Sequence, residues 1–191
     1  MIVLSKGTNW HSGFHRHAAA WFGLTAIFVG LGSVLLHATL TLWGQFFDVM
    51  GMYLVSGFMA VSAIARWRNL SARETVFLYL SLVGGLLIVL YLVPEVRRSL
   101  FAVVLLAAIA LEMMFARPLR HRVRVSYYLA GIAIKAVAFI IWNLDQHGIV
   151  CQPDSLFQGH AVWHLLGATS LWFTFSYYRS EQALESKLSP A

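Results

Sequence analysis

Apolar residues run in six long stretches along this chain, and short clusters of polar, charged or turn-forming residues separate them. A membrane core about 30 Å thick requires roughly 17–25 mostly apolar residues in one helix, and each stretch reaches this length. The pattern therefore predicts an all-α integral membrane protein, a bundle of six transmembrane helices. The predicted spans are residues 18–40, 49–65, 75–93, 99–116, 125–142 and 160–178, with a turn at Trp43-Gly44-Gln45 between the first two.

Composition narrows the class of protein further. Apolar residues make up 59% of the chain and charged residues 12%, with a mean hydropathy of +0.70, whereas soluble domains are about 45–50% apolar and about 25% charged. This composition excludes a water-soluble monomer. One cysteine and four prolines also exclude a disulfide scaffold and collagen. No predicted connection is longer than about 20 residues, too short for a further soluble domain, so we expect residues 1–191 to form a single transmembrane domain.

The net charge of +6 is unevenly distributed over the predicted loops. Of the 14 Lys and Arg residues, only Arg97 and Arg98 fall in loops of one side, and Lys135 lies inside a helix. The positive-inside rule then predicts that both termini are cytoplasmic. Short loops and the lack of a retention signal favour a bacterial inner membrane over a eukaryotic endomembrane. The basic stretch at 117–124 is interpreted as a cytoplasmic stop signal that contacts anionic lipid, rather than as a nucleic-acid patch, so no nucleic acid is expected as a partner.

Polar and ionisable side chains inside the predicted helices gather toward one end of the bundle. Such groups are costly in a bilayer and are therefore candidates for function. Because successive helices alternate in direction, the helix ends that carry them all meet on the outer side, where Asp48 is expected to begin the second helix. These residues are Ser33, His37, Asp48, Asn143, Asp145, His160 and His164.

The histidines among them suggest a metal site. His160 and His164 are four residues apart, which places both imidazoles on one helical face within reach of one ion. His37 would add a third nitrogen and leave a fourth position for water, as in a catalytic zinc site. Iron and nickel accept the same ligands and remain alternatives. Two histidines at this spacing can also serve only in helix packing. The metal site is the favoured interpretation because His37 and Asp48 are expected at the same depth in the membrane.

The other polar residues allow two interpretations each. Ser33 on its own would more often donate a hydrogen bond to its own helix. Asp145 would either support a metal-bound imidazole or serve as a helix cap. Glu112 and Lys135 are the charges furthest from a predicted helix end, and we interpret them as an ion pair. The alternative is that Lys135 extends its ammonium group toward the membrane surface.

Three segments, in order along the chain, resemble the alkaline ceramidase family, which belongs to a superfamily with adiponectin-type receptors and haemolysin-III-like proteins. Residues 32–40, which contain Ser33 and His37 and are followed by Asp48, resemble the family's serine, histidine and aspartate block. Trp142-Asn143-Leu144-Asp145, with Cys151 downstream, resembles its "WNxD…C" segment. Residues 160–164 resemble its "HAxWH" block. The resemblance covers most of the chain, from the first predicted helix to the sixth.

The resemblance implies a zinc-dependent membrane amide hydrolase that cleaves ceramide, or a related lipid amide, into a sphingoid base and a fatty acid. It implies that His37, His160 and His164 hold Zn²⁺, that Asp48 orients or deprotonates the metal-bound water, and that Ser33 stabilises the oxyanion. The alternative is a metal-containing receptor or signalling protein of the same superfamily with little or no turnover. A channel or transporter is disfavoured, because its ionisable residues would be spread across the full membrane thickness.

The chain also departs from the family pattern. The family has seven helices, with an acidic calcium-binding segment ahead of the first, whereas six are predicted here and residues 1–17 contain no Asp or Glu. The family's first helix is therefore expected to be missing, and no calcium site is predicted. Besides the lipid substrate and the surrounding membrane lipids, an oligomer or a partner helix is expected to complete the lipid cavity, unless the cavity is simply more open.

Overall fold

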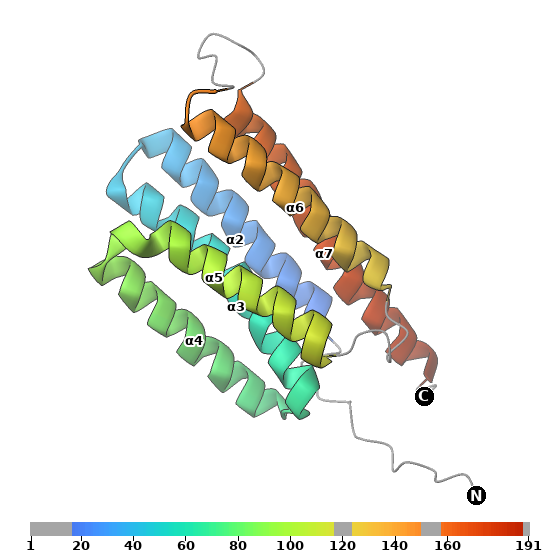
Figure 1. Ribbon diagram of the computed structural model, residues 1–191. Coiled ribbons are helices and arrows are strands. Elements are labelled where there is room, and N and C mark those ends of the chain that lie inside the picture. The colour runs from blue at the N-terminus through green and yellow to red at the C-terminus, as the bar shows by residue number, and fades with distance from the viewer. Residues whose placement is uncertain (1–16, 117–123, 150–157, 189–191) are drawn as a thin grey trace, which may run out of the picture. The chain divides into compact units, whose positions relative to one another are not determined.

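In a computed structural model that describes residues 17–116, 124–149 and 158–188, every element is a helix and no strand occurs in these ranges (Figure 1). The chain divides into two compact units, Met1–Pro118 and Leu119–Ala191, each described by itself below. Most of the basic stretch at 117–124 and Cys151 lie outside the described residues.

The helices agree with the predicted membrane bundle. The first unit contains α2 (Ala18–Thr39), α3 (Leu42–Arg68), α4 (Ala72–Leu92), η1 (Pro94–Val96), α5 (Arg97–Ala110) and η2 (Leu111–Ala116). The second unit contains α6 (Val125–Gln146) and α7 (Gly159–Leu188). Five described helical segments are long and apolar enough to cross a membrane: α2, α3, α4, α6 and the continuous run Pro94–Ala116. The sixth predicted span lies within the 30 residues of α7.

The predicted turn at Trp43-Gly44-Gln45 is wrong, because α3 already begins at Leu42. Leu40 adopts a left-handed conformation (φ 51°) and ends α2. The side chain of Thr41 then caps α3 by accepting a hydrogen bond of 3.0 Å from the amide of Gly44, as threonine commonly does before a helix. Asp48 consequently lies in the second turn of α3 and does not begin it.

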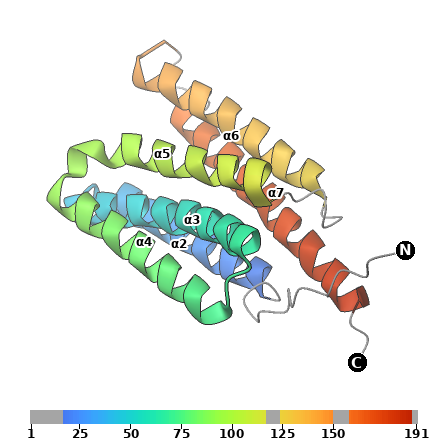
Figure 2. The same ribbon diagram turned by 60° about the horizontal axis from the view of Figure 1, so that its bottom comes forward.

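Within the first unit, α3 is the central helix and contacts α2, α4 and α5 (Figure 2). In its most apolar window 67% of the residues are buried, compared with 22% or less for the other candidate spans. Val49 and Tyr53 of α3 pack with Leu86 and Leu90 of α4, and α5 residues join this cluster. The hydroxyl of Tyr53 donates a hydrogen bond of 3.1 Å to the carbonyl of Arg97 at the start of α5. The first unit is therefore organised around α3.

A buried ion pair joins the far end of α3 to the end of α5. Glu112 lies in η2, a single turn of π-helix that continues α5, and it pairs with Arg66 in the last turn of α3. Both side chains are 1% exposed, so ending the predicted span at residue 65, which leaves Arg66 in a loop, is wrong. The rings of Trp67 and Phe115 pack beside the pair, with centroids 4.6 Å apart. The ion pair thus lies where two apolar helices meet.

In the second unit, α6 and α7 pack along each other in antiparallel directions. At one end Asp145 of α6 lies against Gly159, the first residue of α7. Further along, the hydroxyl of Ser170 donates a hydrogen bond of 2.8 Å to the carbonyl of Gly131. Between these points the ammonium group of Lys135 lies 3.9 Å from the ring centroid of Trp163. This cation–π contact gives Lys135 a partner that the sequence analysis did not foresee.

The buried pair in the first unit leads to a stability prediction. We expect Glu112→Gln to lower the free energy of unfolding by about 3–5 kcal/mol, because it leaves the Arg66 charge without its buried counter-charge. Thermal unfolding in detergent micelles measures this loss. Glu95→Gln is the matched control, since Glu95 is exposed in η1, and such surface changes usually stay within about 0.5 kcal/mol. The double variant Arg66→Met/Glu112→Leu should recover most of the loss. Equal stabilities of Glu112→Gln and Glu95→Gln would contradict the prediction.

Candidate metal and catalytic site

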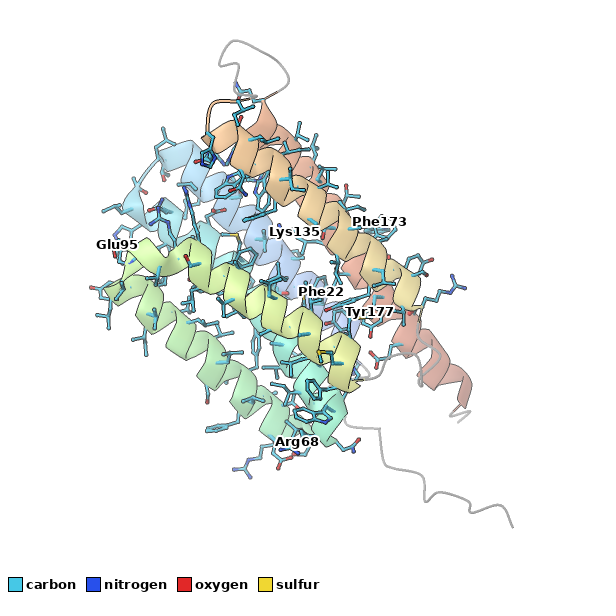
Figure 3. The ribbon with its side chains drawn as sticks, in the orientation of Figure 1. Phe22, Arg68, Glu95, Lys135, Phe173 and Tyr177 are labelled. Atoms are coloured by element: carbon cyan, nitrogen blue, oxygen red, sulfur yellow. The ribbon has the colours of Figure 1, made fainter. Side chains whose placement is uncertain are left out.

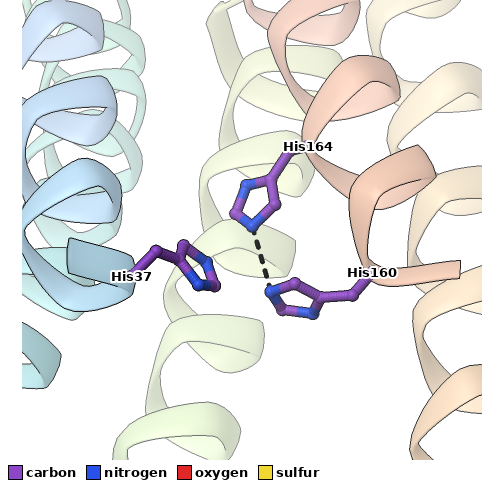
Figure 4. A group of neighbouring side chains, drawn as sticks. All are labelled: His37, His160 and His164. Carbon is purple, nitrogen blue, oxygen red and sulfur yellow. Dashed lines mark hydrogen bonds between the residues drawn. The ribbon is translucent and has the colours of Figure 1, made fainter. Parts of the chain in front are cut away.

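The two histidines of the HxxxH pattern come together in the first turns of α7. His160 is the second residue of the helix and His164 follows one turn later. Their Nε2 atoms are 3.0 Å apart, and the ring centroids are 4.7 Å apart (Figure 4). Two nitrogens that bind one zinc ion at 2.0–2.1 Å in tetrahedral geometry are about 3.3 Å apart. The pair is therefore close to the arrangement of two ligands of a single metal ion.

His37 lies in the last turn of α2, in the first unit, and its side chain is exposed. His160 and His164 are both half-buried. All three residues carry imidazole nitrogens, which are among the preferred ligands of zinc. This is the donor set that the sequence analysis selected.

A close approach of α2 to α3 positions Ser33 and Asp48. A Cβ atom added to Gly32 of α2 would lie 2.7 Å from the carbonyl carbon of Phe47 and 2.9 Å from the Cα of Asp48. Carbon atoms in ordinary contact are about 3.5–4.0 Å apart, so only glycine fits here. Because Ser33 follows Gly32 directly, Ser33 and Asp48 lie at the same level of the two helices.

The close contact between α2 and α3 at Gly32 and Gly44, called the glycine seam below, continues toward the end of α2. A Cβ atom added to Gly44 of α3 would lie 2.8 Å from the Cα of Leu36, the residue before His37. Gly44 and Asp48 are four residues apart and therefore share one face of α3. Asp48, which is half-buried, is thus on the face of α3 that packs against α2. The seam carries Ser33, His37 and Asp48 within two turns of helix.

The two polar residues near the end of α6 behave differently from each other. The side-chain amide of Asn143 donates a hydrogen bond of 2.7 Å to the carbonyl of Phe139 in its own helix, so Asn143 stabilises α6 locally. Asp145 instead reaches α7, because a Cβ atom added to Gly159 would lie 2.8 Å from its Oδ1 atom. A carboxylate at a helix N-terminus interacts favourably with the helix dipole. Asp145 therefore contacts the start of α7, one residue before His160.

Comparison with protein families decides the family of this chain. A family model described as Ceramidase matches residues 2–189, nearly the whole chain. The chain belongs to the ceramidase family. Neither a comparison with curated proteins nor one with solved structures finds a match. Family membership confirms the predicted resemblance and supports a membrane enzyme, an amide hydrolase that acts on ceramide.

Two glycines that position the candidate site residues have packing roles that the sequence alone does not reveal. Gly32 is part of the segment that resembles the family, yet its packing role is visible only in three dimensions. Gly44 is interpreted from sequence as a turn residue, whereas it lies inside α3. Thr41, three residues before Gly44, was the available signal for an earlier helix start.

The seam predicts opposite effects for two neighbouring glycines of α2. Gly32→Ala should lower the free energy of unfolding by about 1–3 kcal/mol, as overpacked cores do, and should reduce ceramide hydrolysis by displacing Asp48. Gly30→Ala is the control, because nothing lies within 4 Å of a Cβ atom added there, and alanine favours the helix. Unfolding and turnover are measured on both purified variants. Equal behaviour of the two variants would show that the seam does not position the site.

Proposed function

We propose that this ceramidase-family protein is a zinc-dependent amide hydrolase that cleaves ceramide, or a closely related lipid amide, into a sphingoid base and a fatty acid. The observation that carries the proposal is the histidine pair of α7, whose Nε2 atoms are 3.0 Å apart. His37 is the third proposed ligand, because it lies in the block of α2 that resembles the ceramidase family and this family matches nearly the whole chain.

The chemistry of these donors fits zinc. Imidazole nitrogens are among its preferred ligands, and catalytic zinc sites use three protein ligands with one position left open. A zinc ion bound there would supply a Lewis acid that polarises the amide carbonyl and makes water a stronger acid. His37, His160 and His164 would hold the ion, and the remaining steps would fall to other side chains of the chain.

Asp48 is the proposed general base and acid. Its carboxylate would accept a proton from the attacking water as the water oxygen bonds to the carbonyl carbon. When the carbon–nitrogen bond breaks, Asp48 would deliver that proton to the leaving nitrogen, which gives the free amine and the fatty acid. A carboxylate positioned in this way typically contributes about 10²–10⁴-fold to a rate. The placement of Asp48 on the α2-facing side of α3, next to Gly32, supports this role.

Ser33 is the proposed oxyanion donor. Its hydroxyl would donate a hydrogen bond to the carbonyl oxygen as negative charge develops there, and a single donor of this kind is typically worth about 10²–10³-fold in turnover. Ser33 is half-buried and lies at the level of Asp48, next to Gly32, which supports a shared site.

The membrane setting completes the proposal. We propose that both termini are cytoplasmic, as the distribution of Lys and Arg predicts, with the site toward the outer side of the membrane. The substrate would then enter from the surrounding lipid, with its amide near the headgroup level and its hydrocarbon tails among apolar helices. A bacterial inner membrane is the proposed location.

Metal content and turnover test the proposed function. The purified protein should contain about one zinc ion per chain and should release fatty acid from ceramide, and a chelator should abolish both. His160→Ala should lose more than about a hundredfold in zinc affinity, since even the partners of metal ligands are worth 10–100-fold. His147→Ala is the control, because His147 follows α6 directly and its Nδ1 atom is 2.7 Å from the carbonyl oxygen of Asn143 in the last turn of that helix. Full activity of His160→Ala would overturn the assignment, and bound zinc without turnover would favour a receptor.

The catalytic roles have a separate test. Asp48→Asn and Ser33→Ala should lower the turnover number by about 10²–10⁴-fold and about 10²–10³-fold, respectively. Both variants should keep their zinc, because neither residue is a proposed ligand. Ser99→Ala, a change at an exposed serine of α5, should leave turnover unchanged. Loss of zinc from Asp48→Asn would instead make Asp48 a ligand.

A further inference from the structure

Lys135 places a positive charge at the midpoint of α6, a helix long and apolar enough to span the membrane (Figure 3). Its ammonium group lies 3.9 Å from the ring centroid of Trp163. A Cβ atom added to Gly167, one turn further along α7, would lie 3.8 Å from the same nitrogen. The ammonium group therefore lies at the level of His164, which comes between Trp163 and Gly167 in the sequence.

A charge at this depth costs free energy, and an apolar side chain would pack between two helices without that cost. The contact with Trp163 offsets part of this free-energy cost, because an ammonium group over an indole ring is attracted by the negative face of the ring. That attraction depends on the charge, and it acts on one specific ring of α7.

Other aromatic residues hold the same ring. The centroid of Trp163 is 5.8 Å from that of Trp142 and 6.5 Å from that of Phe139, both on α6. Lys135 and these two rings thus contact Trp163 from three positions along α6. These contacts with α6 restrict the rotamer of the Trp163 side chain.

The position of Trp163 sets the direction of the histidine pair. With 3.6 residues per turn, Trp163 lies about 60° from His160 and about 100° from His164 around the axis of α7. A rotation of this part of α7 that released Trp163 from Lys135 would turn both imidazoles by the same angle. The direction of the Nε2 atoms therefore depends on where the indole is held.

We propose that Lys135 is a positioning residue for the metal site, which acts through its cation–π contact with Trp163 to keep His160 and His164 aimed at one ion. The proposal rests on the proposed function, since it assumes that the histidine pair binds metal. Lys135 itself is neither a ligand nor a group that touches the substrate.

Zinc affinity of the full chain in detergent tests this proposal, measured by competition with a chromophoric chelator. Lys135→Met keeps the length of the side chain and removes the charge, and it should weaken zinc binding about 10–100-fold, the range seen for partners of metal ligands. Lys135→Arg keeps the cation over the ring and should stay within about threefold of the parent protein. Ile140→Met, a lipid-exposed change on the same helix, should leave the affinity unchanged.

Two further measurements separate positioning from simple packing. The metal-free Lys135→Met protein should unfold at the same temperature as the parent protein or higher, because it no longer carries a charge in the middle of an apolar helix. Adding Lys135→Met to Trp163→Leu should not weaken zinc binding beyond Trp163→Leu alone, as expected when two residues act through one contact.

Several outcomes would overturn the proposal. Unchanged zinc affinity of Lys135→Met in a parent protein that binds zinc would remove this role and leave the proposed function intact. Equal weakening by Lys135→Met and Lys135→Arg would remove the cation–π mechanism. A lower unfolding temperature of the metal-free Lys135→Met protein would make Lys135 a structural residue. A parent protein that binds no zinc would overturn both the proposed function and this inference.

Discussion

The close approach of α2 to α3 at Gly32 is the constraint on which the first unit depends. Inside a bilayer, apolar side chains gain little by leaving lipid for protein, so helices associate through close packing of small residues and through polar contacts. Gly32 on α2 and Gly44 on α3 provide that packing, and each lies against the backbone of the other helix. A chemical consequence follows from the packing, because the backbone that touches Gly32 is that of Phe47 and Asp48. The same contact that holds the helices together sets the level of Ser33 and Asp48.

Three charged side chains of the described helices, Arg66, Glu112 and Lys135, lie where one helix packs against another. Lipid tails cannot solvate a charge, so an ionisable side chain in a membrane finds a partner inside the protein. Arg66 and Glu112 form an ion pair at the end of α3 opposite to Asp48, and their position supports a structural role. Lys135 has an aromatic partner, and that partner lies between the two histidines in the sequence of α7. The partners differ in what lies next to them. The Arg66–Glu112 pair joins α3 to the end of α5, whereas Trp163, the partner of Lys135, lies beside the two proposed metal ligands of α7.

Much of the fold follows from the sequence, because spans of apolar residues report directly on membrane helices. The histidine pair follows equally well, since a spacing of four places two side chains on one face of any helix. The helix boundaries near charged residues cannot be predicted from the sequence in the same way. Charge normally marks the end of a span, which places Arg66 just beyond the predicted span at 49–65, yet a counter-charge on Glu112, distant in the sequence, lets α3 continue through it. Partners of this kind depend on which helices pack together, and periodicity within one helix carries no information about that.

The location of the candidate site at helix ends fits the requirements of lipid hydrolysis. Ser33 and His37 lie in the last two turns of α2, Asp48 in the second turn of α3, and His160 and His164 in the first two turns of α7. A hydrolase for a membrane lipid needs water at the scissile bond and hydrocarbon around the tails, and the end of a span is where both are available. At such a position the backbone of a helix is least constrained by its own hydrogen bonds. Precise aim of the side chains must then come from contacts between helices, namely the glycine seam for Ser33 and Asp48, and the contacts of Trp163 with α6 for the histidine pair.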